Sequence, residues 1–205
     1  MRTIMSLAAT EIKGVVSHDR HPQSERRTQI SIVDISRAYF NAKVDPEHPA
    51  FVELPNEDPD KSKGMCGQLD YHMYGARPAG KGWHTEYYSY LVDHMGFSMG
   101  DASACVFRHF ERGLWASVCG DDFTTTGSKA DLDWFVEQLK QRYELTESAR
   151  LGPGSQDDKE GRVLNRILRW TAAGLEYEAD PRQVEKLVRD LRLVGANPVS
   201  TPGSK

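Results

Sequence analysis

The sequence predicts an α+β fold with a largely antiparallel sheet. Stretches with helical spacing are interspersed with short strand-like stretches, and several of these follow one another at hairpin distance rather than across long crossovers. The chain has 205 residues, 39% of them hydrophobic and 27% charged. This composition suffices for one compact domain or two small subdomains that share a core, and it argues against a disordered or fibrous protein.

Apolar spacing and end residues indicate four helices. Ser128 and Asp180 are suited to cap the N-termini of the last two, and Gly96 and Gly195 are placed to end the second and the fourth. The third helix has the clearest apolar face, with side chains spaced i, i+3, i+4 and i+7. The expected helices cover residues 4–8, 83–94, 129–139 and 181–191.

Short apolar stretches between these helices predict strands. A turn at residues 172–174 is expected to join the last two strands as a hairpin. The run LGPGSQDD makes residues 151–160 linker-like, so we expect a body of residues 1–150 and a tail of residues 161–205. The expected strands are residues 29–34, 50–54, 104–110, 114–119, 123–126, 162–170 and 175–178.

Charge is distributed unevenly along the chain. The net charge is −4 at pH 7, which argues against binding of nucleic acid by bulk positive charge. Residues 162–205 nevertheless carry eight Lys or Arg against five Asp or Glu, a surplus of +3 that leaves −7 for the rest. An acidic body with a basic tail suits a cation site beside an arm that binds a polyanion, although solvated surface charges give the same sum.

Several classes of protein are not indicated by the sequence. No apolar run is long enough to cross a bilayer, and the first ten residues lack the form of a secretory signal. Cys66, Cys105 and Cys119 are an odd number without CxxC spacing, so neither a disulfide framework nor a zinc site is indicated. We expect an intracellular protein without membrane contact, in the cytoplasm or the nucleus.

Three acidic residues are candidates for chemistry. In the stretch LWASVCGDDFTTT, apolar residues alternate as in a strand, are interrupted at Gly120, Asp121 and Asp122, and then resume. This pattern predicts a β-hairpin with the acids in its turn. An acidic pair in a turn commonly serves turn formation alone. A third acid, Asp34, ends the first expected strand, where it could also be a helix N-cap. Three carboxylates at neighbouring strand ends repel one another unless a divalent cation lies among them, and their hard oxygen atoms suit Mg²⁺.

Three ordered motifs resemble those of a known family. They are VDISRAYFNA around Asp34, LDYHMYGARPAGKGW over residues 69–83 and SVCGDDF around Asp121. Together they resemble the palm of a reverse transcriptase of the Ty1/copia retrotransposon type. Downstream, DLDWFVEQLKQRYEL resembles the helix after the catalytic hairpin, and KEGRVLNRILRWTAAGLEYEADPRQVEKLVRDLRL followed by STPGSK resembles the primer-contacting hairpin and the start of the thumb. The resemblance covers nearly the whole chain.

The resemblance implies an RNA-directed DNA polymerase that joins a dNTP to a primer 3′-hydroxyl on an RNA or DNA template. The reaction it implies uses two Mg²⁺ ions, for which Mn²⁺ can substitute. Asp34 and Asp121 match the carboxylates that bridge the metals, and Asp122 matches the weaker acid beside them. The carbonyl of Ile35 can add a ligand to the ion on the nucleotide side.

Further residues match substrate contacts of the family. Tyr39 matches the aromatic beneath the incoming sugar, where it excludes a 2′-hydroxyl; as a core aromatic it would instead pair with Phe40. Gly75 would permit close backbone approach below the template and the incoming base. The expected contacts are Tyr39, Phe40, Gly75 and Arg77 to the nucleotide and Arg166 and Arg169 to the primer backbone.

The chain departs from the family pattern at the acidic turn. Cys119 and Gly120 stand where an aromatic and a small apolar residue usually precede the acids. Gly120 gives the GDD of RNA-dependent RNA polymerases, an alternative that Tyr39 opposes, and Cys119 is expected to be a buried structural cysteine. The basic fingers have no counterpart in the sequence, so we expect the isolated chain to polymerise weakly or not at all. The main alternative is a catalytically silent remnant that binds nucleic acid or a partner.

Overall fold

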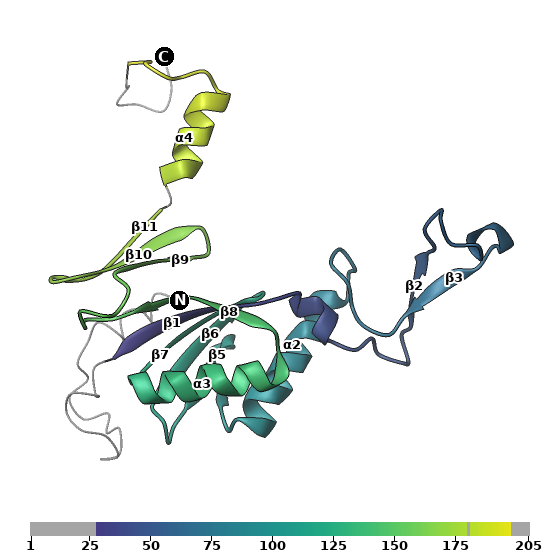
Figure 1. Ribbon diagram of the computed structural model, residues 1–205, viewed down its shortest axis with the longest axis horizontal. Helices are drawn as coiled ribbons and strands as arrows, with labels where there is room; N and C mark the ends of the chain where they lie inside the picture. Colours follow the sequence, from purple (N-terminus) through teal and green to yellow (C-terminus); the bar gives the residue numbers. More distant parts are fainter. Residues whose placement is uncertain (1–27, 180, 198–205) are drawn as a thin grey trace.

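A computed structural model describes residues 28–179 and 181–197 of the chain (Figure 1). Its centre is a six-stranded sheet in the order β4-β5-β6-β7-β1-β8, with each neighbouring pair antiparallel. The strands of this sheet are β1 Gln29–Ile35, β4 Ser98–Gly100, β5 Ser103–His109, β6 Leu114–Cys119, β7 Asp122–Gly127 and β8 Leu145–Leu151. The predicted α+β class with mostly antiparallel strands is therefore confirmed.

Two helices cover one face of this sheet. They are α2 Ala79–Ser89, which continues as the π-helical turn η4 Tyr90–His94, and α3 Lys129–Arg142. The Ser128 side chain accepts a hydrogen bond from the Asp131 N–H, which confirms the predicted N-cap of α3. Trp83 and Phe135 of the helices pack with Val33 and Phe123 of the strands in one buried cluster.

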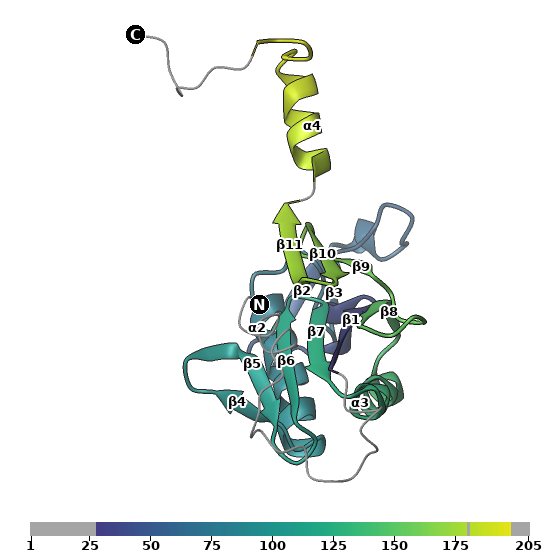
Figure 2. The same cartoon turned by 90° about the vertical axis from the view of Figure 1, so that its left-hand side faces the viewer.

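A second sheet lies over part of the opposite face (Figures 1 and 2). It consists of β9 Glu160–Val163, β10 Arg166–Thr171 and β11 Gly174–Ala179. Val163 and Leu168 of this sheet form a buried cluster with Ile30 and Ile32 of β1. Strand β1 is therefore buried on both faces, and only Asp34 near its end is exposed.

Two parts of the chain extend from this body (Figure 1). Between β1 and α2, the turn η2 Ala38–Asn41 leads to a ribbon of β2 Ala50–Glu53 and β3 Cys66–Leu69, with η3 Lys61–Lys63 between its strands. Beyond β11, helix α4 Pro181–Asp190 points away from the sheets (Figure 2). No helix within residues 28–179 and 181–197 is long and apolar enough to cross a membrane.

One predicted strand is wrong, because the structure divides it into two strands, β9 and β10. The sequence predicts a single strand over residues 162–170, but Leu164 and Asn165 have φ values of 50° and 58°, and Val163 pairs with Arg166. Positive φ at both central residues is the pattern of a type I′ turn, so the stretch folds back as a hairpin. The next hairpin, between β10 and β11, forms as predicted, with Thr171 paired to Gly174.

Other elements differ from the predictions in number and extent. Strands β3, β4 and β8 were not predicted, and α2 begins at Ala79 rather than at residue 83. Helix α4 ends at Asp190, before the expected stop at Gly195. The expected helix at residues 4–8, the polar stretch at residues 18–27 and the cap Asp180 lie outside the described residues.

The linker-like run is a hydrogen-bonded loop between β8 and β9. The Asp157 carboxylate accepts from Gln29 Nε2 at 2.7 Å and from the Gly154 N–H at 2.7 Å. Lys159 Nζ donates to the carbonyl oxygens of Gly152 and Gly154 at 2.7 and 2.6 Å. These bonds close the loop on itself and fasten it to the start of β1. The division of the chain into a body and a tail at this loop stays a prediction.

Candidate active site

The acidic turn is the two-residue loop of the β6–β7 hairpin. Cys119 pairs with Asp122, which leaves Gly120 and Asp121 as the central residues. Gly120 has φ 65°, and a positive φ at the first central residue alone is typical of a type II′ turn, where glycine is favoured. The hairpin predicted from the sequence therefore forms, with Asp121 at its tip and Asp122 as the first residue of β7.

The third acid reaches the same end of the sheet on the neighbouring strand. In the β1–β7 pair, Asp34 lies directly opposite Asp122. Opposed residues project their side chains to the same face, which here is the face that also carries Ile32, opposite the helices. The Ile35 N–H donates to the Asp121 carbonyl oxygen at 2.9 Å, which fixes β1 against the turn. The three acids predicted from separate motifs are thus brought together.

The acids interact unfavourably with one another. Burial raises the pKa of Asp34, and the negative charge of Asp121 raises it further. Burial also raises the pKa of Asp122, followed by the charges of Asp121 and Asp34. A cluster in which each ionised carboxylate opposes the next is stabilised by a cation.

The acids fit a divalent cation in chemistry and charge. Carboxylate oxygens and a nearby backbone carbonyl are the hard ligands that Mg²⁺ prefers, and Mg²⁺ needs few of them because water and phosphate complete its shell. Within residues 28–179 and 181–197, however, no three His, Cys, Asp or Glu side chains are grouped as a preformed metal cluster. The carboxylates therefore share an end of the sheet without forming a closed set of ligands.

Aromatic residues border the acids. Tyr39 is half-buried in η2, and its ring meets the Tyr74 ring edge-on at 4.6 Å between centroids. Phe40, 48% exposed, lies 5.8 Å from the same ring. Burial raises the pKa of the Tyr74 phenol, and the negative charges of Asp121 and Asp34 raise it further. Tyr74 was not predicted from the sequence; its signal was an aromatic directly before Gly75 in a motif already singled out.

A comparison with protein families decides the ancestry of the chain. The model of the family described as reverse transcriptase (RNA-dependent DNA polymerase) matches residues 23–205. The chain belongs to the reverse transcriptase family. No curated protein matches it. Reverse transcriptases generally bind a nucleic-acid template-primer and deoxynucleoside triphosphates and use divalent metal ions, as the acids and aromatics of this site would require.

The other predicted contacts of this reverse transcriptase chain lie in the loop before α2 and in the second sheet. Gly75, with φ 87°, and Arg77 lie in the loop between β3 and α2, where both are exposed. Arg166 is exposed, and its guanidinium carbon lies 5.3 Å from the centre of the Tyr177 ring in the second sheet. Arg169 is bound by two carboxylates, Nε to Glu160 at 2.7 Å and Nη1 to Glu178 at 2.5 Å.

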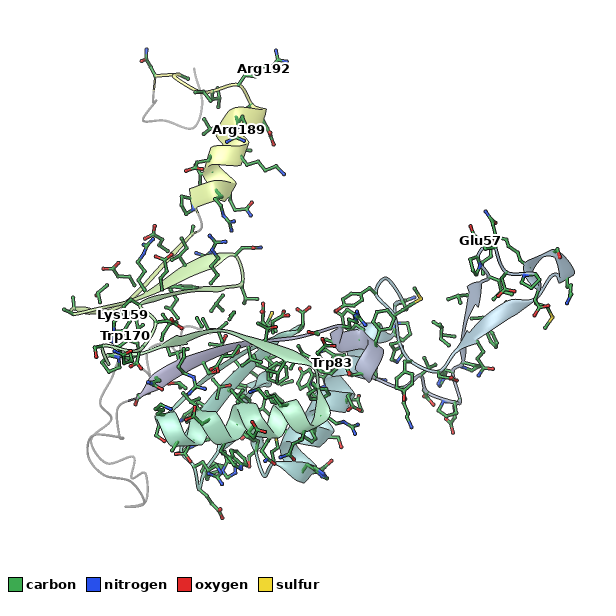
Figure 3. The ribbon with its side chains drawn as sticks, in the orientation of Figure 1. Glu57, Trp83, Lys159, Trp170, Arg189 and Arg192 are labelled. Atoms are coloured by element: carbon green, nitrogen blue, oxygen red, sulfur yellow. The ribbon has the colours of Figure 1, made fainter. Side chains whose placement is uncertain are left out.

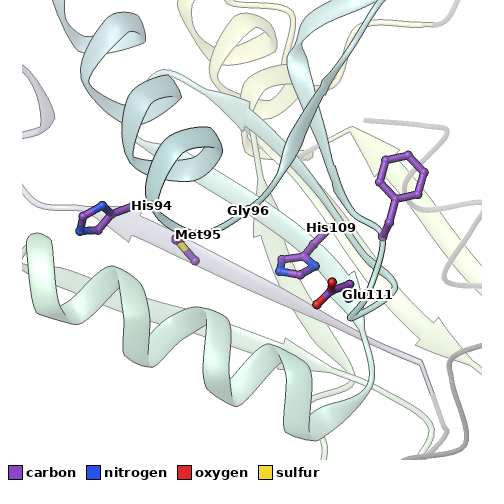
Figure 4. A pocket seen from close by; sticks show the side chains of 6 residues that line it. His94, Met95, Gly96, His109 and Glu111 are labelled. Atoms are coloured by element: carbon purple, nitrogen blue, oxygen red, sulfur yellow. The ribbon is translucent and has the colours of Figure 1, made fainter.

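Two further features of this reverse transcriptase chain lie outside the acidic cluster. Cys119 is exposed, so the expectation of a buried structural cysteine is wrong: it pairs with Asp122 and lies on the face of the sheet opposite the helices, whereas Val118 packs against them. A hollow is lined by His94, Met95, Gly96, His109, Phe110 and Glu111 (Figure 4). It lies where β5 passes into β6, at the opposite end of β6 from the acids, and contains none of the predicted site residues.

Proposed function

We propose that this chain is the palm, with the start of a thumb, of an RNA-directed DNA polymerase of the Ty1/copia type. It would transfer a nucleotide from a dNTP to a primer 3′-hydroxyl. The observation that carries the proposal is the pairing of Asp34 with Asp122 beside the Asp121 turn, because it joins two motifs far apart in the sequence. In the proposed division, residues 1–150 form the palm and residues 161–205 the primer-contacting part.

Asp34, Asp121 and Asp122 are the proposed catalytic residues. Asp34 and Asp121 would hold two Mg²⁺ ions jointly, with the Ile35 carbonyl and Asp122 as supporting ligands. When bound, such ions lower the pKa of the primer 3′-hydroxyl and neutralise the triphosphate. The hydrogen bond from the Ile35 N–H to Asp121 supports this assignment, because it holds two of the proposed ligand residues against each other.

The aromatic group would select the sugar. The Tyr39 ring, supported by Tyr74, would occupy the space that a 2′-hydroxyl needs. Phe40 is exposed beside them and would extend this apolar floor. Gly75 and Arg77 would face the base and the phosphates from the adjoining loop.

The β10–β11 hairpin would contact the primer. Arg166 is better placed than Arg169 for a phosphate, because the Arg169 guanidinium already binds Glu160 and Glu178. We propose that both arginines contact the primer backbone, Arg166 more strongly than Arg169. Their charge lies in the part of the sequence that carries the basic surplus.

Primer extension and Mn²⁺ binding together test the proposal. Purified chain, with Mg²⁺ or Mn²⁺ and four dNTPs, is compared with Asp121→Asn and with Asp101→Asn, an exposed acid outside the site. We expect weak or no extension by the purified chain, since positioning of the substrate supplies roughly 7–11 kcal/mol and the acidic balance of this chain offers few cations to hold the triphosphate. We also expect Mn²⁺ binding, followed by electron paramagnetic resonance, that Asp121→Asn abolishes and Asp101→Asn preserves.

The outcomes separate the two candidate functions. Extension or Mn²⁺ binding that depends on Asp121 supports the polymerase site. Equal Mn²⁺ affinity in all three proteins, with salt-sensitive binding of nucleic acid, leaves the silent binding module as the function. That alternative is favoured by the lack of a preformed three-residue metal cluster in the described part of the chain.

A further inference from the structure

A buried tryptophan contacts the acidic turn from the helical side. Trp83 Nε1 donates a hydrogen bond of 2.7 Å to the Gly120 carbonyl oxygen. The residue comes from α2, lies 37 positions before Gly120, and is 1% exposed (Figure 3). An indole has one polar hydrogen, and here it is used on the backbone of the turn rather than on a neighbouring side chain.

The indole is held in place by its surroundings. Its ring meets the Tyr87 and Tyr143 rings edge-on, at 5.5 and 5.3 Å between centroids. The preceding residue, Gly82, allows close approach of another segment, since a Cβ there would lie 2.2 Å from the His72 ring. A ring packed in this way has little freedom to rotate, so the direction of its N–H is fixed by the core.

Both carbonyl oxygens of the two-residue loop are engaged. Gly120 accepts from Trp83, and Asp121 accepts from the Ile35 N–H at 2.9 Å. The turn is therefore bonded from α2 on one side and from β1 on the other. Because the peptide groups on both sides of the Asp121 Cα are fixed, so is the direction in which its side chain leaves the backbone.

We infer that Trp83 is a positioning residue for Asp121, acting through its indole N–H on the Gly120 carbonyl. This inference rests on the proposed function, in which Asp121 holds a divalent cation. Its physical basis is that residues bonded to the backbone or side chain of a ligand set the ligand's direction, and their loss typically weakens metal binding roughly 10–100-fold. Trp83 is buried on the helical side of the sheet, so it would act through the turn and not on the ion or the substrate directly.

The test removes the N–H and keeps an aromatic ring. Trp83→Phe is compared with wild type and with Trp134→Phe, a control at a half-buried tryptophan that packs on Arg112 elsewhere in the fold. We expect Trp83→Phe to bind Mn²⁺ roughly 10-fold more weakly, and Trp134→Phe to bind as wild type does. Circular dichroism and thermal melting report whether each variant is folded.

A second measurement does not depend on the variant's stability. The wild-type protein contains four tryptophans, and substitution of the other three, Trp115, Trp134 and Trp170, one at a time assigns the remaining indole N–H resonance to Trp83. We expect the Trp83 resonance to shift during a Mg²⁺ titration with the midpoint of ion binding, and to stay unchanged in Asp121→Asn. A merely structural tryptophan would show no such coupled shift.

The results distinguish failure of this inference from failure of the proposed function. If Asp121→Asn binds Mn²⁺ like wild type, the cation site itself is refuted. If Asp121→Asn loses the ion while folded Trp83→Phe keeps wild-type affinity, only the role of Trp83 is refuted. If Trp83→Phe does not fold, the indole resonance of the wild type decides: a shift supports positioning, and its absence overturns it.

Discussion

At the scale of single residues, the clustered acids lower the stability of the fold, because their negative charges lie close together and are partly buried. Burial and neighbouring charges both raise the pKa of Asp122, so its ionised form is less favourable in the fold than in the unfolded chain. Sites of this kind commonly gain stability when one charge is removed, with a loss of function. The cluster is therefore a place where folding and the proposed chemistry make opposite demands.

We expect Asp122→Asn to melt at a higher temperature than wild type when divalent ions are absent. The amide removes repulsion with Asp34 and Asp121 and retains the shape of the side chain. The increase should be about 1–4 °C, as for a small gain in stability in a chain of this length. Differential scanning calorimetry in EDTA measures it, and Asp101→Asn serves as the exposed control. A lower melting temperature would show that the acids do not repel one another.

Sugar selection is the second property of single residues. In a polymerase that contains this chain and extends primers, Tyr39→Val should raise the use of ribonucleotides relative to deoxynucleotides by on the order of 10- to 100-fold, since the removed ring leaves space for a hydroxyl. Tyr74→Ala should act in the same direction and more weakly, because its ring supports that of Tyr39. Competition between labelled nucleotides measures the ratio. Tyr71→Val, at an exposed tyrosine, is the control, and unchanged selection in Tyr39→Val would assign Tyr39 to packing alone.

At the scale of elements, helices and strands with a regular local pattern of apolar residues were predicted correctly, and those without one were missed. Strand β6 was predicted with its observed bounds, and α3 with its cap, because alternation and helical spacing are both unbroken there. Strand β8, LTESARL, was missed because few of its side chains are apolar; it is set by pairing with β1, which a local pattern does not contain. The break at residues 164 and 165 was hidden for a related reason, since leucine rarely takes positive φ and does not mark a turn.

The acids of the candidate site could be predicted from the sequence, but the residues that hold the turn and the aromatic group in place could not. Motif order identified Asp34, Asp121 and Asp122, and strand pairing brought them together. Trp83 and Tyr74 stood in a quoted motif without a distinct role, because their roles depend on contacts between elements that are distant in sequence. Burial of both faces of β1 was also unforeseen, since it requires the second sheet.

The turn between β9 and β10 offers a test at this scale. Leu164 and Asn165 both have positive φ, which an Asn-Gly pair adopts with less strain. We expect the double variant Leu164→Asn with Asn165→Gly to gain about 1 kcal/mol in the free energy of unfolding, measured by urea titration. The same Asn-Gly pair at Ala172 and Ala173, which lack positive φ, is the control and should give no such gain. A loss at residues 164 and 165 would contradict the type I′ assignment.

At the scale of the whole molecule, the basic surplus lies in the part of the sequence that follows the acidic body. We expect Arg166→Gln to weaken binding of a primer-template duplex and to reduce the slope of log affinity against log salt by about 1, as loss of one phosphate contact does. Arg169→Gln should have a smaller effect, because Glu160 and Glu178 already neutralise this guanidinium. Fluorescence anisotropy over a salt series measures both. Equal salt slopes for Arg166→Gln and wild type would move the primer contact elsewhere.

The stability of the whole fold should depend on pH through His109. This side chain, 8% exposed, packs edge-on against Phe97 and Trp134 and so lies between the sheet and α3. Burial lowers its pKa, the positive charge of Arg112 lowers it further, and Glu111 and Asp131 oppose them only in part. The fold therefore prefers the neutral ring, while the unfolded chain binds a proton near the ordinary pKa of about 6.5.

The sign of the effect follows from this lowered pKa. The stabilisation is complete above about pH 6.5 and is lost as the pH falls from there through the lower pKa of the folded state, because only the unfolded chain gains the proton. Between about pH 7.5 and 5.5, we expect wild type to lose about 2–4 °C more in Tm than His109→Gln, which keeps a hydrogen-bond acceptor and does not titrate. His48→Gln, at an exposed histidine, should follow wild type. Parallel melting curves for wild type and His109→Gln across this range would show that protonation of His109 is not what destabilises the fold in acid.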